Sequence, residues 1–193
     1  MATETLSAAP AAPAASDWVR RWTHLIPTGA SVLDLACGRG RHMQWLQQQG
    51  LIPLGVDRDA QALIVASAFG EVVQADLENQ AWPFNTSSFA GIVVTNYLWR
   101  DRWADLLACL QPGGVLIYET FASGNETVGK PSNPDFLLKP GELLSLCKGL
   151  RVVGYEDGFC QSPDRFVQRI AAVQVLQGQS HLPERHALTR PGH

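Results

Sequence analysis

The chain has 193 residues, of which 46% are hydrophobic, and 15 lysine and arginine against 18 aspartate and glutamate residues give it a formal net charge of −3. This length and apolar content predict one domain with a continuous core, and the negative balance disfavours nucleic acid as a partner. No apolar run approaches the roughly 20 residues that a membrane-spanning helix needs. We therefore expect a cytoplasmic protein that requires no membrane.

The two ends of the chain differ in composition from its middle. Residues 1–15 are mostly alanine, proline, serine and threonine, and residues 178–193 are polar. Neither end has enough large apolar side chains to offset the entropy that is lost on ordering. We expect two disordered tails, 1–15 and 178–193, around one folded domain at 16–177.

Helical patterns begin close to the start of that domain. Asp17 is expected to cap a helix that runs to about residue 24 and carries Trp18 and Trp22 at helical spacing. This helix would cover a ligand cleft, or its two tryptophans would simply pack in the core. Further helices are predicted at 100–110 and at 141–148.

Strand-like runs alternate with the helical patterns through the rest of the domain. The candidates are the runs at 31–36, 52–57, 71–76, 90–96 and 113–120. Such alternation predicts a parallel sheet with right-handed crossovers. The two later runs, 150–155 and 166–176, lie close enough for an antiparallel hairpin. The sequence thus predicts an α/β protein with a Rossmann-like, seven-stranded, doubly wound sheet and one antiparallel strand near the C-terminus.

The first strand run passes into a glycine-punctuated turn, Ala36-Cys37-Gly38-Arg39-Gly40, and then into a helical pattern. Glycines lack a Cβ atom, so they allow positive φ angles and a close approach of a ligand to the backbone. The second strand run ends at Asp57, one βαβ unit further on, where a carboxylate usually holds ribose hydroxyls. The third run ends at Asp76, on the same predicted edge of the sheet. This order predicts a site for a nucleotide-type cofactor.

Two residues discriminate between the possible cofactors. Met43 stands where the dinucleotide fingerprint has its third glycine, and a bulky side chain there argues against NAD or FAD. Asp34 lies inside the first strand, where it would repel a pyrophosphate but would attract a ligand that carries an ammonium and a sulfonium. These observations favour S-adenosylmethionine.

The segment Asp34 to Gly40, together with Asp57 and Asp76, resembles the successive motifs of class I S-adenosylmethionine-dependent methyltransferases. The runs at 95–100 and 112–121 are similar to the fourth and fifth strands of the small bacterial branch with tellurite-resistance-type and thiopurine-type enzymes. The resemblance covers about residues 17–176 and makes 16–177 a methyltransferase domain. Ala36 departs from the pattern, because many members have the first of three glycines there.

The resemblance implies a role for each matching residue. The residues expected to hold the methionine moiety are Asp34 and the backbone of Ala36, Cys37, Gly38 and Gly40. Those expected to hold the adenosine are Asp57 at the ribose, Arg58 on one adenine face, and Asp76 with Leu77 at the adenine edge. Asn96, just past the fourth strand, is expected beside the sulfonium.

Methyl transfer from a sulfonium needs alignment and exclusion of water more than it needs reactive side chains. Tyr97 and Glu119 are the catalytic candidates. The ring of Tyr97 would attract the sulfonium, stack on a flat acceptor or pack in the core. Glu119 would be a general base or, alternatively, would form an ion pair with an arginine such as Arg100 or Arg102. The simplest interpretation of these two arginines is that they are solvent-exposed charges around the rim of the site.

Three further features complete the predicted site. The loop at 122–134 is rich in turn formers and is expected to be a lid or specificity segment, with an apolar anchor at 136–138. His42 is expected to face solvent. The five histidines are scattered, so no metal is predicted.

The sequence therefore predicts an S-adenosylmethionine-dependent methyltransferase that acts on a small molecule by in-line transfer, as a monomer or weak homodimer. Two other functions stay open at this stage. One is a non-catalytic protein that binds S-adenosylmethionine, and the other is a nicotinamide-dependent oxidoreductase, against which Met43 and the C-terminal hairpin argue.

Overall fold

A computed structural model describes residues 14–85, 87–176 and 184–189. Most of the two predicted tails lies outside these residues, so their disorder stays a prediction. Over the described ranges, no helix combines the length and the apolar character that crossing a membrane requires.

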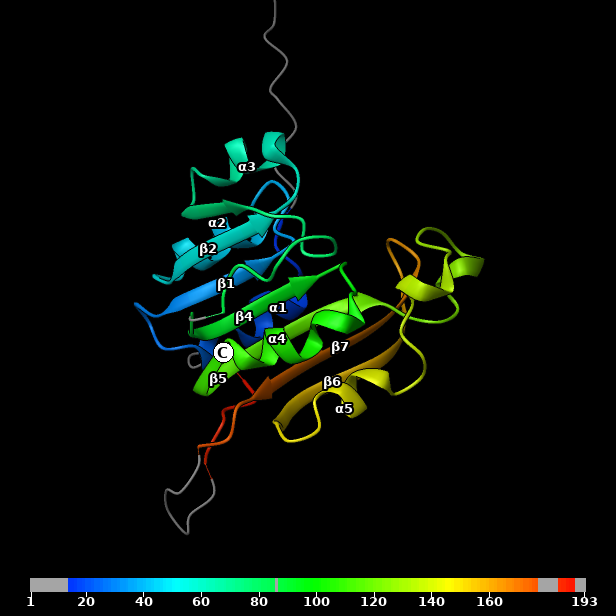
Figure 1. The fold of residues 1–193 in the computed structure, drawn as a ribbon. Coiled ribbons are helices and arrows are strands. Elements are labelled where there is room, and N and C mark those ends of the chain that lie inside the picture. Colours follow the sequence, from blue (N-terminus) through cyan, green and yellow to red (C-terminus); the bar gives the residue numbers. More distant parts are fainter. Residues whose placement is uncertain (1–13, 86, 177–183, 190–193) are drawn as a thin grey trace, which may run out of the picture.

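One seven-stranded sheet organises the molecule, with the strand order β3-β2-β1-β4-β5-β7-β6 (Figure 1). The strands are β1 Ser31–Leu35, β2 Ile52–Asp57, β3 Glu71–Gln74, β4 Phe89–Thr95, β5 Leu110–Phe121, β6 Arg151–Cys160 and β7 Arg165–Val173. Strands β1 to β5 are parallel, and β7 pairs antiparallel with both β5 and β6. The predicted sheet, with one reversed strand near the C-terminus, is confirmed.

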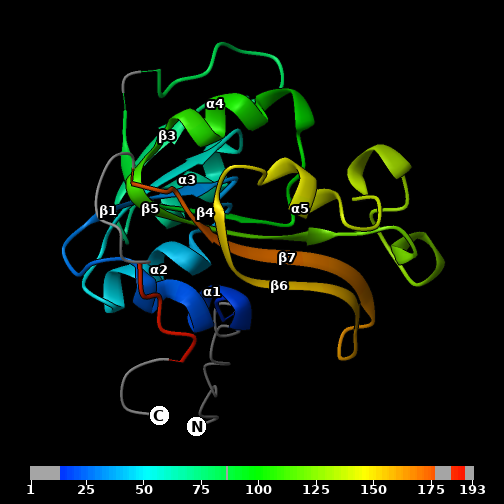
Figure 2. The ribbon, with the colours of Figure 1, turned by 90° about the horizontal axis from the view of Figure 1, so that it is seen from below.

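Helices cover both faces of this sheet. They are α1 Asp17–Trp22, α2 Arg41–Gln48, α3 Ala60–Ala66, α4 Trp103–Ala108 and α5 Glu142–Leu146, with 3₁₀ turns η1 Thr23–Leu25, η2 Arg100–Arg102, η3 Asn125–Thr127 and η4 Pro134–Phe136. Figure 2 shows α1 and α2 below the sheet and α4 and α5 above it. Each face has its own buried cluster, so burial of apolar surface on both sides fixes the parallel strands.

The cap of the first helix lies one residue earlier than predicted. The Oγ of Ser16 accepts a hydrogen bond from the Trp18 backbone N–H at 3.1 Å, so Ser16 is the N-cap and the prediction for Asp17 is wrong. Asp17 is exposed and pairs with Arg20 instead. Trp18 and Trp22 are both buried in the core. Of the two alternatives for these tryptophans, packing in the core is therefore confirmed.

The predicted helix at 100–110 is shorter in the structure. It consists of η2 and α4, and Leu110 is already the first residue of β5. Two apolar residues on one side of α4, Trp103 and Leu106, are buried against the sheet. The error lies at the boundary, where an apolar leucine fits a helix face and a buried strand equally well.

Met43 packs into a space left open by a glycine in the neighbouring strand. A Cβ atom added at Gly55 would overlap Met43 Sδ and would lie 2.8 Å from Cys37 Sγ. Met43 itself is fully buried. The bulky residue at the position of the dinucleotide glycine is thus accommodated by the absence of a side chain in β2.

Replacing Gly55 by alanine should lower the free energy of unfolding by about 1–3 kcal/mol, because the new methyl group overpacks the contact with Met43. The measurement is urea unfolding of the parent and the variant. Gly158→Ala is the matched control, since a Cβ atom at this other strand glycine would meet nothing within 4 Å. Equal losses in the two variants would contradict the packing argument.

Candidate functional site

The glycine-punctuated loop takes left-handed backbone conformations at alternate residues. The φ angles are 54° at Ala36, 54° at Gly38 and 79° at Gly40. A Cβ atom at Gly40 would lie 2.9 Å from the Cα of Ala66, so this glycine also lets α2 approach α3. Ala36 adopts the left-handed conformation at a cost of about 1–2 kcal/mol, which a glycine would avoid.

Asp57 fastens this loop to the end of β2. Its Oδ2 accepts a hydrogen bond from the Gly38 N–H at 2.8 Å, and its Oδ1 accepts one from the Asp59 N–H at 2.9 Å. A carboxylate has about four acceptor positions, so two remain for ribose hydroxyls. Asp57 therefore both shapes the loop and can bind a ligand.

Asp76 organises the turn that follows β3. Its carboxylate accepts hydrogen bonds from the Glu78 N–H at 3.0 Å and from the side-chain amide of Asn79 at 2.9 Å. The hydrogen bond from Asn79, followed by the one from Glu78, holds the pKa of Asp76 below its ordinary value. Arg102 supports the same turn, donating to the carbonyl oxygens of Leu77 at 3.2 Å and residue 80 at 2.7 Å. Arg102 is therefore a clamp on the turn and not a free rim charge.

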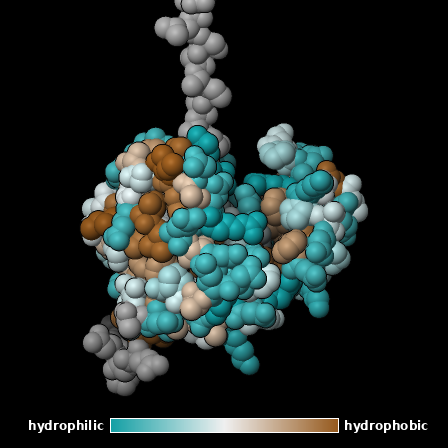
Figure 3. Space-filling view, turned by 45° about the horizontal axis from the view of Figure 1, so that its top comes forward, coloured by the Kyte–Doolittle hydropathy of each residue, from teal (hydrophilic) through white to brown (hydrophobic). Residues whose placement is uncertain are grey.

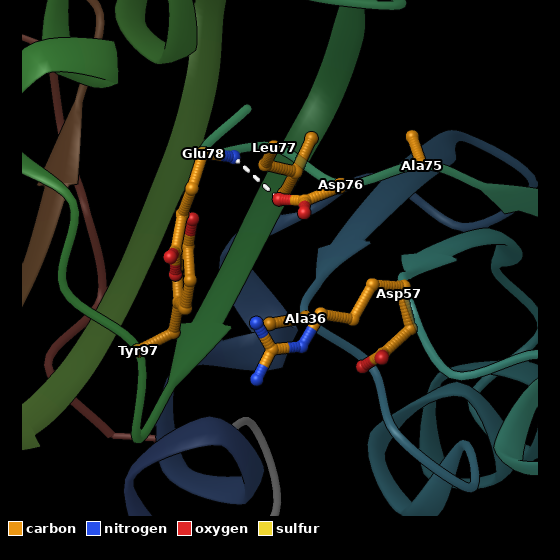
Figure 4. Close-up of a pocket in the computed structure, with 8 residues that line it drawn as sticks. Ala36, Asp57, Ala75, Asp76, Leu77, Glu78 and Tyr97 are labelled. Atoms are coloured by element: carbon orange, nitrogen blue, oxygen red, sulfur yellow. Dashed lines mark hydrogen bonds between the residues drawn. The ribbon is translucent and has the colours of Figure 1, made fainter. Parts of the chain in front are cut away.

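A cavity, which we name the first cavity, opens between the loop and this turn. The residues that line it are Ala36, Asp57, Arg58, Ala75, Asp76, Leu77, Glu78 and Tyr97. Figure 4 shows Asp57 on one side of it and Tyr97 with Glu78 on the other. Its volume of about 150 Å³ is below the range of whole ligand sites, so it has room for only one part of a ligand of nucleoside size.

A second cavity lies on the other side of Tyr97. It is lined by Glu78, Asn96, Tyr97, Leu98, Thr120, Phe121, Pro131 and Phe136. Figure 3 shows the molecule hollowed between its main body and the lobe formed by residues 122–141. Glu78 and Tyr97 line both cavities. The two cavities therefore adjoin at these two side chains.

Tyr97 is the residue most central to the two cavities. Its hydroxyl is buried and has no hydrogen-bond partner in the described part of the chain. Burial raises the pKa of this hydroxyl, and the carboxylates of Glu78 and Asp76 raise it further. The phenol is therefore neutral at physiological pH.

Asp34 and His42 form a buried polar pair beneath the glycine-punctuated loop. His42 Nδ1 lies 3.9 Å from Asp34 Oδ1 and 3.5 Å from Thr95 Oγ1. Burial raises the pKa of Asp34 to about 8 and lowers that of His42 to about 3. At neutral pH the contact therefore joins two uncharged groups, although its geometry is that of an ion pair. The expectation that His42 faces solvent is wrong, because the side chain points from α2 into the sheet.

Glu119 is buried under α1 and forms ion pairs with two arginines of β7. Its Oε2 lies 3.2 Å from Arg169 Nη1, and its Oε1 lies 3.8 Å from Arg165 Nη1. Ser16 Oγ donates a hydrogen bond to Oε1 at 3.1 Å. The alternative of an ion pair was correct for Glu119, but its partners are not Arg100 or Arg102.

Arg100 clamps the lobe to α5. It donates to both carboxylate oxygens of Glu142, at 2.6 Å and 3.0 Å, and to the carbonyl oxygens of Asp135 and Leu137 at 2.6 Å and 2.9 Å. Leu137 and Leu138 are buried, so the predicted apolar anchor of the loop is confirmed. The solvated rim expected for Arg100 is wrong, because four of the five N–H groups of its guanidinium donate hydrogen bonds within the protein.

The predicted site residues fall into five groups. The predicted cofactor residues that line the first cavity are Ala36, Asp57, Arg58, Asp76 and Leu77. Those that form the loop or lie beneath it are Asp34, Cys37, Gly38 and Gly40. Asn96 lines the second cavity, Tyr97 lines both and Glu119 lines neither. Glu78, which also lines both, was missed in the sequence, where only its place two residues after Asp76 pointed to it.

No cluster of three potential metal ligands forms among residues 14–85, 87–176 and 184–189. The prediction that the protein uses no metal is left as a prediction.

Comparison with known proteins finds a family model that matches part of the chain. Residues 32–114 match a model described as a methyltransferase domain, and this segment contains the loop, Asp57 and Asp76. No curated protein sequence matches the chain. The match agrees with the predicted methyltransferase class over this segment.

Solved structures share the fold. TehB from Haemophilus influenzae superposes with a TM-score of 0.65 at 18% identity, over 82% of this chain and 61% of TehB. A TehB-like S-adenosylmethionine-dependent methyltransferase from Corynebacterium glutamicum gives a TM-score of 0.57 at 21% identity, over 80% and 88% of the two chains. The [4+2]-cyclase SpnF gives 0.61 at 14% identity, over 82% and 78%. The chain thus has the fold of S-adenosylmethionine-dependent methyltransferases, and it spans less than two thirds of TehB.

Proposed function

We propose that this chain transfers a methyl group from S-adenosylmethionine to a small molecule, and that the two adjoining cavities hold donor and acceptor. The observation that carries the proposal is that Tyr97 and Glu78 line both cavities, because this places the cavities side by side, and an in-line displacement needs the two reactants in contact range. The residues of the first cavity fit the cofactor, because Asp57 has acceptor positions free for a ribose and Leu77 offers an apolar face to a base.

The chain's own residues would bind, orient and exclude water. Asp57 and the backbone of the loop would hold the donor, and Tyr97 would present its ring and its unpartnered hydroxyl at the boundary between the cavities. The lobe would cover the acceptor and keep water out. S-adenosylmethionine, when bound, supplies an already activated methyl group on its sulfonium.

Calorimetric titration with S-adenosylhomocysteine tests the cofactor half of this proposal. We expect saturable heat from one site per chain, together with a rise in melting temperature that grows with ligand concentration. Absence of both effects at millimolar ligand would defeat it.

A second candidate is a protein that binds the cofactor without transferring its methyl group. The similarity to the [4+2]-cyclase SpnF favours keeping it, because this fold also occurs in a protein named for a different reaction. Saturable cofactor binding without labelled methyl transfer to any fraction of a cell extract would select this candidate. Met43 and the reversed strand β7 count against the nicotinamide-dependent alternative.

Tyr97 and Glu119 are the proposed catalytic residues, and one substitution separates the two accounts of Glu119. Glu119→Gln should lower the free energy of unfolding by about 1–3 kcal/mol, because it removes the charge that pairs with Arg169 in a buried setting. Urea unfolding and turnover per folded molecule are the measurements. Turnover within about twofold of the parent would leave Glu119 a structural residue. A fall of 100-fold or more with unchanged cofactor affinity would establish a base.

The remaining properties are part of the same proposal. We place the protein in the cytoplasm, as a monomer or weak homodimer, with no nucleic acid partner. The supporting observations are the net charge of −3 and the absence of a membrane-spanning helix over the described residues.

A further inference from the structure

We propose that the second cavity binds the methyl acceptor, and that this acceptor is a flat aromatic amine or nitrogen heterocycle without negative charge. The inference rests on the proposed function and deepens it by naming the class of substrate. Its basis is the shape of the cavity walls, their charge and the way in which the lobe is held.

Aromatic side chains give the cavity its shape. Tyr97, Phe121 and Phe136 line it, together with the ring of Pro131. Phe136 stays 41% exposed, so one aromatic face is open to a ligand instead of being covered by the core. Aromatic rings prefer stacked or edge-to-face contacts with other rings, and such walls select a flat acceptor.

Charge excludes anions from the same cavity. Glu78 lines it, whereas no lysine or arginine does so in the described part of the chain. Asp57 and Asp76 border the adjoining first cavity, where Arg58 offsets only one of their two charges, so this cavity adds to the negative potential. Lys130 precedes a lining residue, but its side chain is exposed. A carboxylate or an inorganic oxyanion would lose its hydration without gaining a cation, which is costly.

The polar groups of the cavity suit an N–H donor. Glu78 accepts hydrogen bonds only, and no hydrogen bond of its carboxylate is seen within the described residues. Asn96 and Thr120 add an amide and a hydroxyl from the ends of β4 and β5. An amine nitrogen held between these groups and Tyr97 would face the first cavity, where the donor is expected.

The lobe is fixed in place, so the cavity is largely preformed. Asn125 is buried and donates to the Pro131 carbonyl at 3.1 Å, and its Oδ1 accepts from the Phe166 N–H at 3.2 Å. Arg100 holds the other end of the lobe through Glu142. A wall tied to β7 and to α5 presents its aromatic rings without a large ordering cost on binding.

The step balances as a simple displacement. The lone pair of the acceptor nitrogen forms a bond to the methyl carbon, and the carbon–sulfur bond breaks with its electron pair left on sulfur, which changes from a sulfonium to a thioether. A nitrogen that carried a hydrogen then releases one proton to Glu78 or to water. No oxidant or reductant is needed.

The experiment measures transfer of tritiated methyl groups from S-adenosylmethionine to matched acceptors. The amines are benzimidazole and 2-aminonaphthalene, and the counterparts are 2-naphthoate, 2-naphthalenethiolate and inorganic selenite. We expect the amines to be labelled with a specificity constant at least about tenfold above that of each anion. Stronger labelling of an anion, or no labelling of either amine, would overturn the inference.

Two variants connect the selectivity to the cavity. Glu78→Gln should lower the specificity constant for 2-aminonaphthalene about tenfold. It should also reduce the ratio between the specificity constants for 2-aminonaphthalene and for 2-naphthoate. Phe136→Ala should raise the KM for benzimidazole. Glu71→Gln is the matched control, because it removes the same charge from an exposed residue of β3. It should behave like the parent. If this ratio were the same in Glu78→Gln as in the parent, the charge of Glu78 would not determine the selectivity against anions.

Calorimetry with S-adenosylhomocysteine on each protein keeps the two proposals apart. If the parent binds no S-adenosylhomocysteine, the proposed function fails. If it binds this ligand but methylates only anions, the function stands and the inference alone fails.

Discussion

Replacing Asp57 by alanine is expected to weaken binding of S-adenosylhomocysteine by at least about 100-fold, since the two proposed charge-assisted hydrogen bonds to the ribose are each worth about 1.5–3 kcal/mol. The structure adds a second effect. The variant also loses the acceptor for the Gly38 N–H, so the loop itself should loosen and the melting temperature should fall. Isothermal calorimetry and thermal unfolding measure the two effects separately.

Asp59→Ala is the matched control for this substitution. Asp59 accepts hydrogen bonds from the first N–H groups of α3 and lies two residues beyond Asp57. Its removal should cost about 1 kcal/mol of stability through the lost cap and should leave ligand affinity within about twofold. If Asp57→Ala bound the ligand like this control, the assignment of the ribose carboxylate would be wrong.

The second large effect concerns pH. Burial raises the pKa of Asp34 from its ordinary value of 3.8 to about 8. The positive charge of Arg41 acts in the opposite direction and lowers this pKa, and the negative charge of Asp57 raises it by a smaller amount. At pH 7 the free protein therefore holds a proton on Asp34. A cofactor ammonium near this carboxyl favours the ionised form, so binding should release that proton. Apparent affinity should rise by up to about tenfold per pH unit below pH 8 and then level off.

The pH dependence that Asp34 gives to the stability of the free protein has the opposite sign to that of ligand affinity. The folded state keeps a proton on Asp34 that the unfolded state gives up above pH 4, so this group alone lowers stability by about 1.4 kcal/mol per pH unit between about pH 4 and 8. His42 contributes with the opposite sign below its ordinary pKa of 6.5, because the unfolded chain takes up a proton there that the folded chain, with the His42 pKa lowered to about 3, does not. The two contributions largely cancel between about pH 4 and 6.5, so stability without ligand should fall as the pH rises from about 6.5 to 8.

Titrations of S-adenosylhomocysteine in buffers of different ionisation enthalpy detect the released proton. Asp34→Asn should abolish the release and flatten the pH dependence, and what remains in that variant reports the cofactor's own amino group. Equal proton release by parent and variant would show that Asp34 does not sense the ligand.

The architecture was largely predictable, because hydrophobic pattern and turn chemistry agree along most of the chain. The run at 52–57 is the observed β2 without a change at either end. Boundaries failed where one residue satisfies two patterns. Leu110 completes a helical stripe and also opens a buried strand, and only pairing with Phe89 of β4 decides for the strand.

The binding residues were predictable where they follow strand ends. Asp57 and Asp76 lie where parallel strands finish, and both line the first cavity. Glu78 was missed because it lies in a turn that Asp76 and Arg102 shape, and no strand pattern marks it.

Partners distant in sequence account for the other errors. His42 was expected in solvent because a lone histidine on an amphipathic helix usually is, but Asp34 and Thr95 lie beneath it. Arg100 meets Glu142 across 42 residues, and Glu119 meets Arg169 across 50. Contacts at such separations depend on how the strands are ordered, which local patterns do not reveal.

The contact between Met43 and Gly55 ties together two positions of the sequence. A homologue with a small residue at position 43 is free to carry a side chain at position 55, whereas one that keeps methionine must keep glycine. We expect these two columns to covary among relatives, and a dinucleotide-type glycine at 43 to coincide with valine, isoleucine or alanine at 55. The pair would then mark a lineage within the fold by its packing, independently of any residue that touches a ligand.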